Sequence, residues 1–165
     1  MIAAWLVNLL DDPGISSMME NKKRPYSILM LEDDADDRLI TESTFSSKGF
    51  NVELIFLVSG KQVMEYLSQC GQGRTYHFPD LVLLDKNIPM HSGLDVLNEI
   101  KSHPVYKKIP VVMVSGTAFQ QDVDEAYKLG VNSFIQKPGS DKMTIEKISS
   151  FVKYWFETVE LPELI

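Results

Sequence analysis

Carboxylate, hydroxyl and ammonium side chains follow four of the short apolar runs in this sequence, where each run ends. They are Glu32, Asp33 and Asp34 after the first run, Asp85 after the third, Ser115 after the fourth and Lys137 after the fifth. Clustered carboxylates repel one another unless a cation lies among them, and oxygen ligands alone suit Mg²⁺ better than Zn²⁺. An aspartate can act as a nucleophile, and a lysine with a metal can neutralise a phosphoryl group in transfer. These residue types together are those that phosphoryl transfer to a carboxylate requires.

The elements that must bring these groups together are five short apolar runs, at residues 26–31, 52–58, 81–84, 111–114 and 133–135. A longer amphipathic stretch follows each run, as in Val63, Leu67 and Cys70 at i, i+4 and i+7. Alternating strands and helices predict an α/β fold, in which helices cover both faces of a (βα)5 parallel sheet. Ligands of such sheets bind beyond the carboxyl ends of the strands, so the polar groups are expected to share one edge.

Capping signals and glycines set the expected helix boundaries. Two capping boxes are expected, Ser59 with Gln62 and Thr117 with Gln120. A helix after the second box should turn the stripe Val123, Ala126 and Tyr127 inward and stop at Gly130.

Composition and charge limit the classes of function. The chain has 165 residues, of which 44% are apolar and 24% charged, as expected for one globular domain. Its net charge of −7 argues against nucleic acid and against an anionic membrane surface as partners. No apolar run reaches the roughly 20 residues of a membrane helix. The single cysteine, Cys70, rules out an internal disulfide and fits a reducing compartment, so we expect a cytoplasmic protein.

Three segments are expected along the chain. Residues 1–24 form an extension that is either a short helix around residues 2–10 or a segment with no role of its own. Residues 25–158 form the domain, and residues 159–165 form a C-terminal tail.

Four motifs in one order resemble the receiver domains of bacterial two-component response regulators. They are residues 28–34 (ILMLEDD), 79–90 (PDLVLLDKNIPM) with Gly93, 111–115 (VVMVS) and 134–138 (FIQKP), and the resemblance covers about residues 26–157. The implied fold is a doubly wound, flavodoxin-like parallel sheet with strand order 2-1-3-4-5. The implied function is that of a single-domain response regulator, which is a signalling switch and not an enzyme.

The resemblance also implies roles for individual residues. Asp85 matches the phosphoacceptor, and the implied Mg²⁺ ligands are Asp33, Asp85, the backbone carbonyl of Asn87 and, through water, Glu32. Ser115 and Lys137 match the hydroxyl and the ammonium that bind the phosphoryl group. Phe134 matches the aromatic switch residue, although it could equally be an ordinary core residue. Asp36 and Asp37 are interpreted only as first-turn acids that complement a helix dipole.

Two other functions compete with this reading. A haloacid-dehalogenase-like phosphatase also uses a strand-end aspartate with Mg²⁺, but it needs a second aspartate two residues later, where this chain has Asn87. A receiver-like adaptor that works without phosphorylation would not require the acidic pair, Asp85 and Lys137 together.

The last helix is expected at residues 141–158, with more apolar surface than one face can bury. Its inward stripe is Ile145, Ile148, Val152, Trp155 and Val159, while Phe151, Tyr154 and Phe156 fall outside it. A helix that is apolar beyond one face needs a second partner, so we predict a homodimer through this helix and tail. Residues 155–162 (WFETVELP) are similar to the ends of single-domain receivers associated with phytochrome-type kinases. The implied partner is therefore a sensor histidine kinase, for which the phytochrome type is a candidate.

Overall fold

Five parallel strands form one sheet in the order β2-β1-β3-β4-β5. The computed structural model describes residues 24–47, 50–72, 77–89, 92–137 and 141–163. The strands are β1 (Tyr26–Leu31), β2 (Val52–Leu57), β3 (Leu81–Asp85), β4 (Val111–Ser115) and β5 (Ser133–Gln136). The predicted fold class and strand order are therefore confirmed, and each strand boundary lies within one residue of its expected position.

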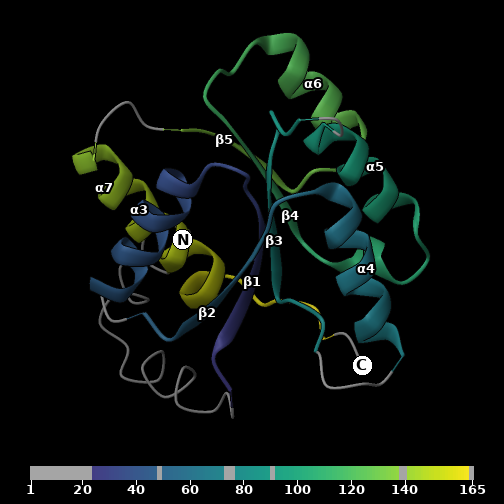
Figure 1. The fold of residues 1–165 in the computed structure, drawn as a ribbon, viewed down its shortest axis with the longest axis horizontal. Helices are drawn as coiled ribbons and strands as arrows, with labels where there is room; N and C mark the ends of the chain where they lie inside the picture. The colour runs from purple at the N-terminus through teal and green to yellow at the C-terminus, as the bar shows by residue number, and fades with distance from the viewer. Residues whose placement is uncertain (1–23, 48–49, 73–76, 90–91, 138–140, 164–165) are drawn as a thin grey trace, which may run out of the picture.

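Helices cover both faces of this sheet (Figure 1). Helices α3 (Ala35–Ser47) and α7 (Asp141–Val152) lie on one face, and α4 (Gly60–Gly71), α5 (Gly93–Ser102) and α6 (Gln120–Lys128) lie on the other. A short 3-10 turn, η1 (Tyr106–Lys108), precedes β4. Because all five strands are parallel, their carboxyl ends lie at the same edge of the sheet. The polar groups were expected at this edge.

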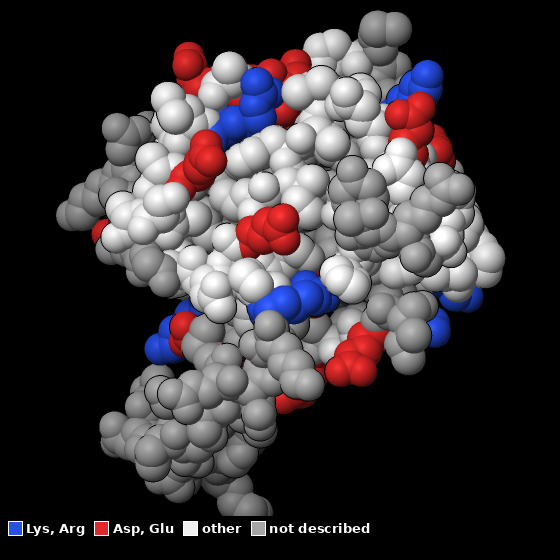
Figure 2. All heavy atoms as spheres, turned by 60° about the horizontal axis from the view of Figure 1, so that its bottom comes forward, with Lys and Arg blue, Asp and Glu red and all other residues white. Residues whose placement is uncertain are grey.

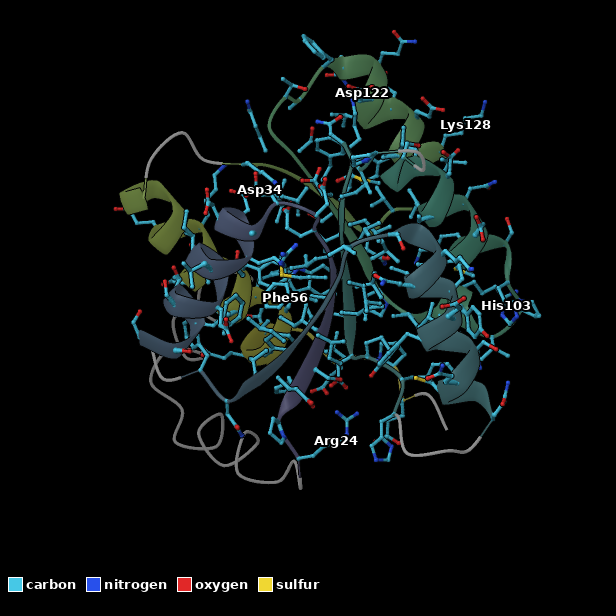
Figure 3. The ribbon with its side chains drawn as sticks, in the orientation of Figure 1. Arg24, Asp34, Phe56, His103, Asp122 and Lys128 are labelled. Carbon is cyan, nitrogen blue, oxygen red and sulfur yellow. The ribbon has the colours of Figure 1, made fainter. Side chains whose placement is uncertain are left out.

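The core has two layers because the central strands are buried on both sides. Leu29 and Leu31 of β1 belong to the cluster under α4, α5 and α6, while Ile28 and Met30 belong to the cluster under α3 and α7. Side chains alternate between the faces of a strand, and a strand covered on both faces reads as a continuous apolar run. Charged groups lie at both ends of the sheet, as Figure 3 shows with Asp34 at one end and Arg24 at the other.

Helix α4 begins as predicted, but α6 does not. The Ser59 hydroxyl accepts the Gln62 N–H at 3.3 Å and caps α4. The N-cap of α6 is Phe119, not Thr117, and no side chain caps it. The Thr117 N–H instead donates to the Ser115 hydroxyl at 3.3 Å, so the chain makes a local turn there before the helix can start.

Fewer side chains of α6 face the core than the apolar stripe Val123, Ala126 and Tyr127 predicted. Ala126 is buried in the core, whereas Tyr127 is exposed. Neighbouring residues differ by about 100° around an α-helix, so a helix that presents Ala126 to the sheet turns Tyr127 outward. Gly130 ends this helix as expected, and its φ of 94° lies in the left-handed region that glycine tolerates.

The C-terminal helix spans the expected residues but changes its winding. After α7 the chain continues as a π-helical segment, η2 (Lys153–Thr158). A π-helix has more residues per turn than an α-helix, so both Trp155 and Phe156 face the core. The ring of Phe156 stacks on Tyr26 with 4.4 Å between centroids, so its predicted place outside the inward stripe is wrong. Val159 and Leu161 pack against the same cluster.

Some sequence-based expectations fall outside the described residues. These are residues 1–23 of the extension, Pro138, the side chain of Ile145 and the last two residues of the tail.

The described surface has mixed charge. Figure 2 shows the face at the amino ends of the strands, where acidic and basic side chains stand in small separate groups among uncharged residues. Within the described part of the chain, no helix has the length and apolar character needed to cross a membrane.

Candidate functional site

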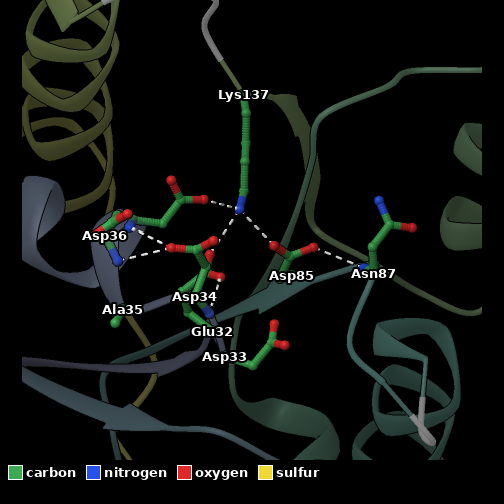
Figure 4. A pocket seen from close by; sticks show the side chains of 9 residues that line it. Glu32, Asp33, Asp34, Ala35, Asp36, Asp85, Asn87 and Lys137 are labelled. Carbon is green, nitrogen blue, oxygen red and sulfur yellow. Dashed lines mark hydrogen bonds and ion pairs between the residues drawn. The ribbon is translucent and has the colours of Figure 1, made fainter.

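An acidic pocket of about 640 Å³ lies at the carboxyl edge of the sheet. Three strands supply its main groups: Glu32 follows β1, Asp85 ends β3 and Lys137 follows β5. The residues that line it are Glu32, Asp33, Asp34, Ala35, Asp36, Asp37, Asp85, Asn87 and Lys137 (Figure 4). Of the groups expected to share this edge, Glu32, Asp33, Asp34, Asp85 and Lys137 line the pocket and Ser115 does not. Asn87, which the resemblance added, lines it as well.

Lys137 is the centre of the pocket's hydrogen bonds. Its Nζ lies 2.6 Å from Asp85 Oδ2, 2.8 Å from Glu32 Oε2 and 2.6 Å from Asp37 Oδ2. Burial disfavours the charged ammonium, but the hydrogen bonds to Asp37, Asp85 and Glu32 outweigh this and raise the pKa of Lys137. Lys137 therefore stays protonated at neutral pH and holds three carboxylates together.

Glu32 is the most deeply placed of these carboxylates, with an exposed fraction of 3%. Its Oε1 accepts the Asp34 N–H at 3.1 Å, while Oε2 accepts from Lys137. Burial raises the pKa of Glu32, and the hydrogen bond and charge of Lys137 offset this in part. The positive charge of Lys137 thus favours the ionised form of Glu32 and opposes the effect of burial.

Asp85 ends β3 with an exposed fraction of 8% and still faces the pocket. Its Oδ1 accepts the Asn87 N–H at 2.8 Å, and its Oδ2 accepts from Lys137. A Cβ at Gly93 would lie 2.2 Å from the Asp85 carbonyl oxygen, a distance that no side chain could tolerate. Gly93 is therefore required for α5 to begin against the backbone of Asp85.

The loop after β1 is held by Asp34 and Arg38. Asp34 Oδ1 accepts the N–H groups of Asp36 (2.8 Å) and Asp37 (3.1 Å), which caps the start of α3 and lowers the pKa of Asp34. Arg38 donates to the backbone carbonyls of Glu32 and Asp33, at 2.9 Å each. Sequence reasoning did not single out Arg38, which fixes the backbone of both acidic residues.

Ser115 and Phe134 lie near the pocket but do not line it. Ser115 is fully buried at the end of β4, and its carbonyl accepts the Lys137 N–H at 2.7 Å. Phe134 of β5 is half-buried and packs against the core cluster under α4, α5 and α6. Both residues are thus linked to Lys137 through the β4–β5 pair rather than through the pocket itself.

Asp37 is the pocket residue that sequence reasoning misread. It was expected only to complement a helix dipole, but its carboxylate is bonded to Lys137. Asp33, by contrast, lines the pocket without a bond to Lys137, and Figure 4 shows its carboxylate apart from the Lys137 group. The signal that could have found Asp37 is the spacing from Asp34, since a cap at Asp34 puts Asp37 in the first turn beside the strand end.

The donor set fits a divalent cation with oxygen ligands. Carboxylate oxygens of Glu32, Asp37 and Asp85, the three partners of Lys137, lie within 4.8 Å of one another and concentrate negative charge beside Asp33 and Asn87. The residues that line the pocket include no histidine or cysteine, which suits a hard cation such as Mg²⁺ or Mn²⁺. One lysine does not balance the charge of these carboxylates, so the pocket has room and charge for a cation.

Comparison with known proteins identifies the family. Residues 28–149 match the response regulator receiver domain. Response regulator Rcp1 of Synechocystis sp. is 34% identical over 145 residues, which cover 88% of this chain and 99% of the relative.

Solved structures give the same result. The phosphorylated cyanobacterial phytochrome response regulator RcpA has a TM-score of 0.77 and 32% identity, covering 84% of this chain and 99% of its own. The Mn²⁺-bound form of Rcp1 has a TM-score of 0.76 and 34% identity, covering 84% of this chain and 100% of its own. With the strand order and the acidic pocket already described, these matches show that the chain belongs to the family of response regulator receiver domains.

Proposed function

We propose that this protein is a single-domain response regulator of a two-component phosphorelay and that Asp85 is its phosphoacceptor. The observation that carries the proposal is the environment of the Asp85 carboxylate, which faces an acidic pocket and lies 2.6 Å from Lys137 Nζ. A phosphohistidine on a sensor kinase would be the donor. Its P–N bond breaks, the electron pair returns to the imidazole nitrogen, and a P–O bond to Asp85 forms.

The residues of the pocket would have different roles in this transfer. Lys137 holds Asp85 in place and supplies positive charge toward the incoming phosphoryl oxygens. Asp33, Asp85 and the Asn87 carbonyl would hold Mg²⁺, with Glu32 acting through water. When bound, the metal neutralises charge on the phosphoryl group.

Switching would begin at Ser115 and reach Phe134. A phosphoryl group adds about −2 charge and strong acceptor oxygens at Asp85. The Ser115 hydroxyl oxygen accepts the Thr117 N–H, and its own O–H can donate to the new phosphoryl group. The loop after β4 then changes its packing and Phe134 turns inward, which biases an equilibrium between two conformations that exist already.

A phosphorylation assay tests this proposal. The protein is incubated with Mg²⁺ and acetyl phosphate, and the intact chain is weighed by mass spectrometry. The expected result is a gain of one phosphoryl group that is absent in Asp85→Ala. No gain with acetyl phosphate or with any histidine kinase would favour the phosphorylation-independent adaptor instead. Steady release of phosphate from small phosphate esters would indicate a phosphatase and contradict the role of a switch.

The proposed partners are proteins in the cytoplasm. The similarity to RcpA, a phytochrome response regulator, supports a phytochrome-type sensor histidine kinase as the donor. The mixed charge of the face shown in Figure 2 and the net charge of −7 favour a protein over nucleic acid as the downstream target.

A homodimer through the C-terminal helix is the proposed assembly. A shallow hollow of about 440 Å³ between β5 and this helix is lined in part by Ile135, Phe151, Tyr154 and Trp155. Tyr154 is 52% exposed, and a second copy would cover it. Sedimentation should show a dimer that Tyr154→Ser weakens, and a wild-type monomer at high micromolar concentration would contradict this assembly.

A further inference from the structure

We propose that Asp37 is the exchangeable partner of Lys137, which the phosphoryl group must displace when it enters the pocket. This inference rests on the proposed function, because it concerns the step in which Asp85 receives the phosphoryl group. It gives Asp37 a positioning role on Lys137 that its place in the first turn of a helix did not suggest.

The first step of the argument is that Lys137 has no donor to spare. An ammonium group has three N–H donors. Asp85, Glu32 and Asp37 lie within 2.8 Å of Nζ, so each donor already has a carboxylate acceptor. A phosphoryl oxygen that binds Lys137 must therefore take the place of one of these carboxylates.

The second step compares the three carboxylates as candidates to leave. Asp85 carries the phosphoryl group itself and stays. The side chain of Glu32 is only 4% exposed and has a second hydrogen bond, from the Asp34 N–H. The side chain of Asp37 is 43% exposed, and within the described residues its carboxylate hydrogen-bonds to Lys137 alone. The Asp37 side chain can rotate toward solvent with less rearrangement than the buried Glu32 side chain. Asp37 is therefore the carboxylate that leaves Lys137.

The third step is electrostatic. The incoming group carries about two negative charges, and Asp37 adds another where that group must sit. Asp37 therefore competes for the lysine and also opposes the approach of an anionic donor. Removal of its charge should ease entry of the donor, even though Asp37 stabilises the resting arrangement of Lys137.

The test compares Asp37→Asn with Asp36→Asn. Both substitutions remove one negative charge from the first turn of α3 and keep the size of the side chain. The backbone N–H groups of both residues bond to Asp34 Oδ1, so the helix cap remains in both variants. Asp36 has no ion pair with Lys137 among the described residues, and it therefore controls for net charge and helix dipole.

Two quantities are measured, the concentration of acetyl phosphate that gives half-maximal phosphorylation and the Mg²⁺ affinity of the unphosphorylated protein. Relative to Asp36→Asn, the half-maximal concentration in Asp37→Asn should fall about two- to fivefold, as expected for loss of one partly exposed ion pair. Mg²⁺ affinity, measured by calorimetry, should agree between the two variants within about twofold.

Two results would overturn the inference. Equal half-maximal concentrations in the two variants would show that Asp37 does not compete for Lys137. A much lower Mg²⁺ affinity in Asp37→Asn alone, with slower phosphorylation, would show that Asp37 is a metal ligand instead. Absence of phosphorylation in the wild-type protein would count against the proposed function, and so the two failures are distinguishable.

Discussion

Lys137 and Lys101 lie at opposite ends of the same sheet, and their partners differ in charge. At the carboxyl end, Lys137 bonds to the carboxylates of Glu32, Asp37 and Asp85. At the amino end, Lys101 Nζ donates to neutral oxygens, which are the carbonyls of Ile109 (2.9 Å) and Lys107 (3.4 Å) and Asn132 Oδ1 (2.9 Å). Lys137 is surrounded by excess negative charge, whereas Lys101 has hydrogen bonds but no ion pair among the described residues.

The electrostatic consequences are opposite. Hydrogen bonds to carboxylates raise the pKa of Lys137, whereas burial lowers the pKa of Lys101 to about 8. Asp80, which also lies at the amino end, has a cationic partner. Its carboxylate accepts from Arg24 at 3.0 Å and from the Ser27 N–H at 2.8 Å. Similar residue types thus build a ligand site at one end and fix strand starts at the other. The difference lies in the excess of carboxylates around Lys137, which the amino end does not show at Lys101 or at the Arg24–Asp80 pair.

The largest expected effect comes from Lys137→Met. This change removes the positive charge that faces the acceptor, so phosphorylation by acetyl phosphate should slow by about a hundredfold or more. It also leaves three carboxylates without their shared ammonium, so the free energy of unfolding should fall and added Mg²⁺ should restore part of it.

Lys101→Met is the matched control for this change. The same substitution at the amino end should leave the phosphorylation rate near that of the wild type, with circular dichroism confirming that both variants fold. If Lys101→Met slowed phosphorylation as much as Lys137→Met, the two ends of the sheet would not differ in the way described.

A smaller effect concerns stability and pH. The folded-state pKa of Lys101 is about 8 and its usual value is 10.5, so between these values the unfolded chain binds more protons than the folded chain. The stability that the wild type has over Lys101→Met should therefore rise as pH rises through this window and fall again as pH drops toward 8.

Urea denaturation of both proteins from pH 7.5 to 10 would measure this difference in the free energy of unfolding, because titration of the groups that both proteins share largely cancels. The contribution of Lys137 to stability has the opposite pH dependence, since its pKa is raised in the folded state. That contribution is lost only as pH rises beyond 10.5 toward the folded-state pKa. A difference between wild type and Lys101→Met that stays flat or falls with pH would contradict the account of Lys101.

Sequence reasoning predicted the sheet well because its signals are local. Buried parallel strands are continuous apolar runs, and the groups at their carboxyl ends must converge whatever the details of the loops. The positions of Glu32, Asp85 and Lys137 followed from this rule alone. The roles of these residues came from the resemblance and are proposals for the assays to decide.

The features that were missed depend on geometry that periodicity does not encode. The start of α6 moved because the Ser115 hydroxyl accepts the Thr117 N–H. Phe156 entered the core because π-helical winding changed the phase of the last helix. Asp37 was missed because its partner, Lys137, lies 100 residues away in the chain.

Two glycines near the site, Gly93 and Gly116, differ in the space around them. Any side chain at Gly93 would collide with the carbonyl of Asp85, so the start of α5 is a rigid stop behind the acceptor. A Cβ at Gly116, after Ser115, would meet no atom within 4 Å. A side chain can therefore replace Gly116 in the loop after β4 without a clash, whereas none can replace Gly93 beside the acceptor, so the chain can vary on one side of the site and not on the other.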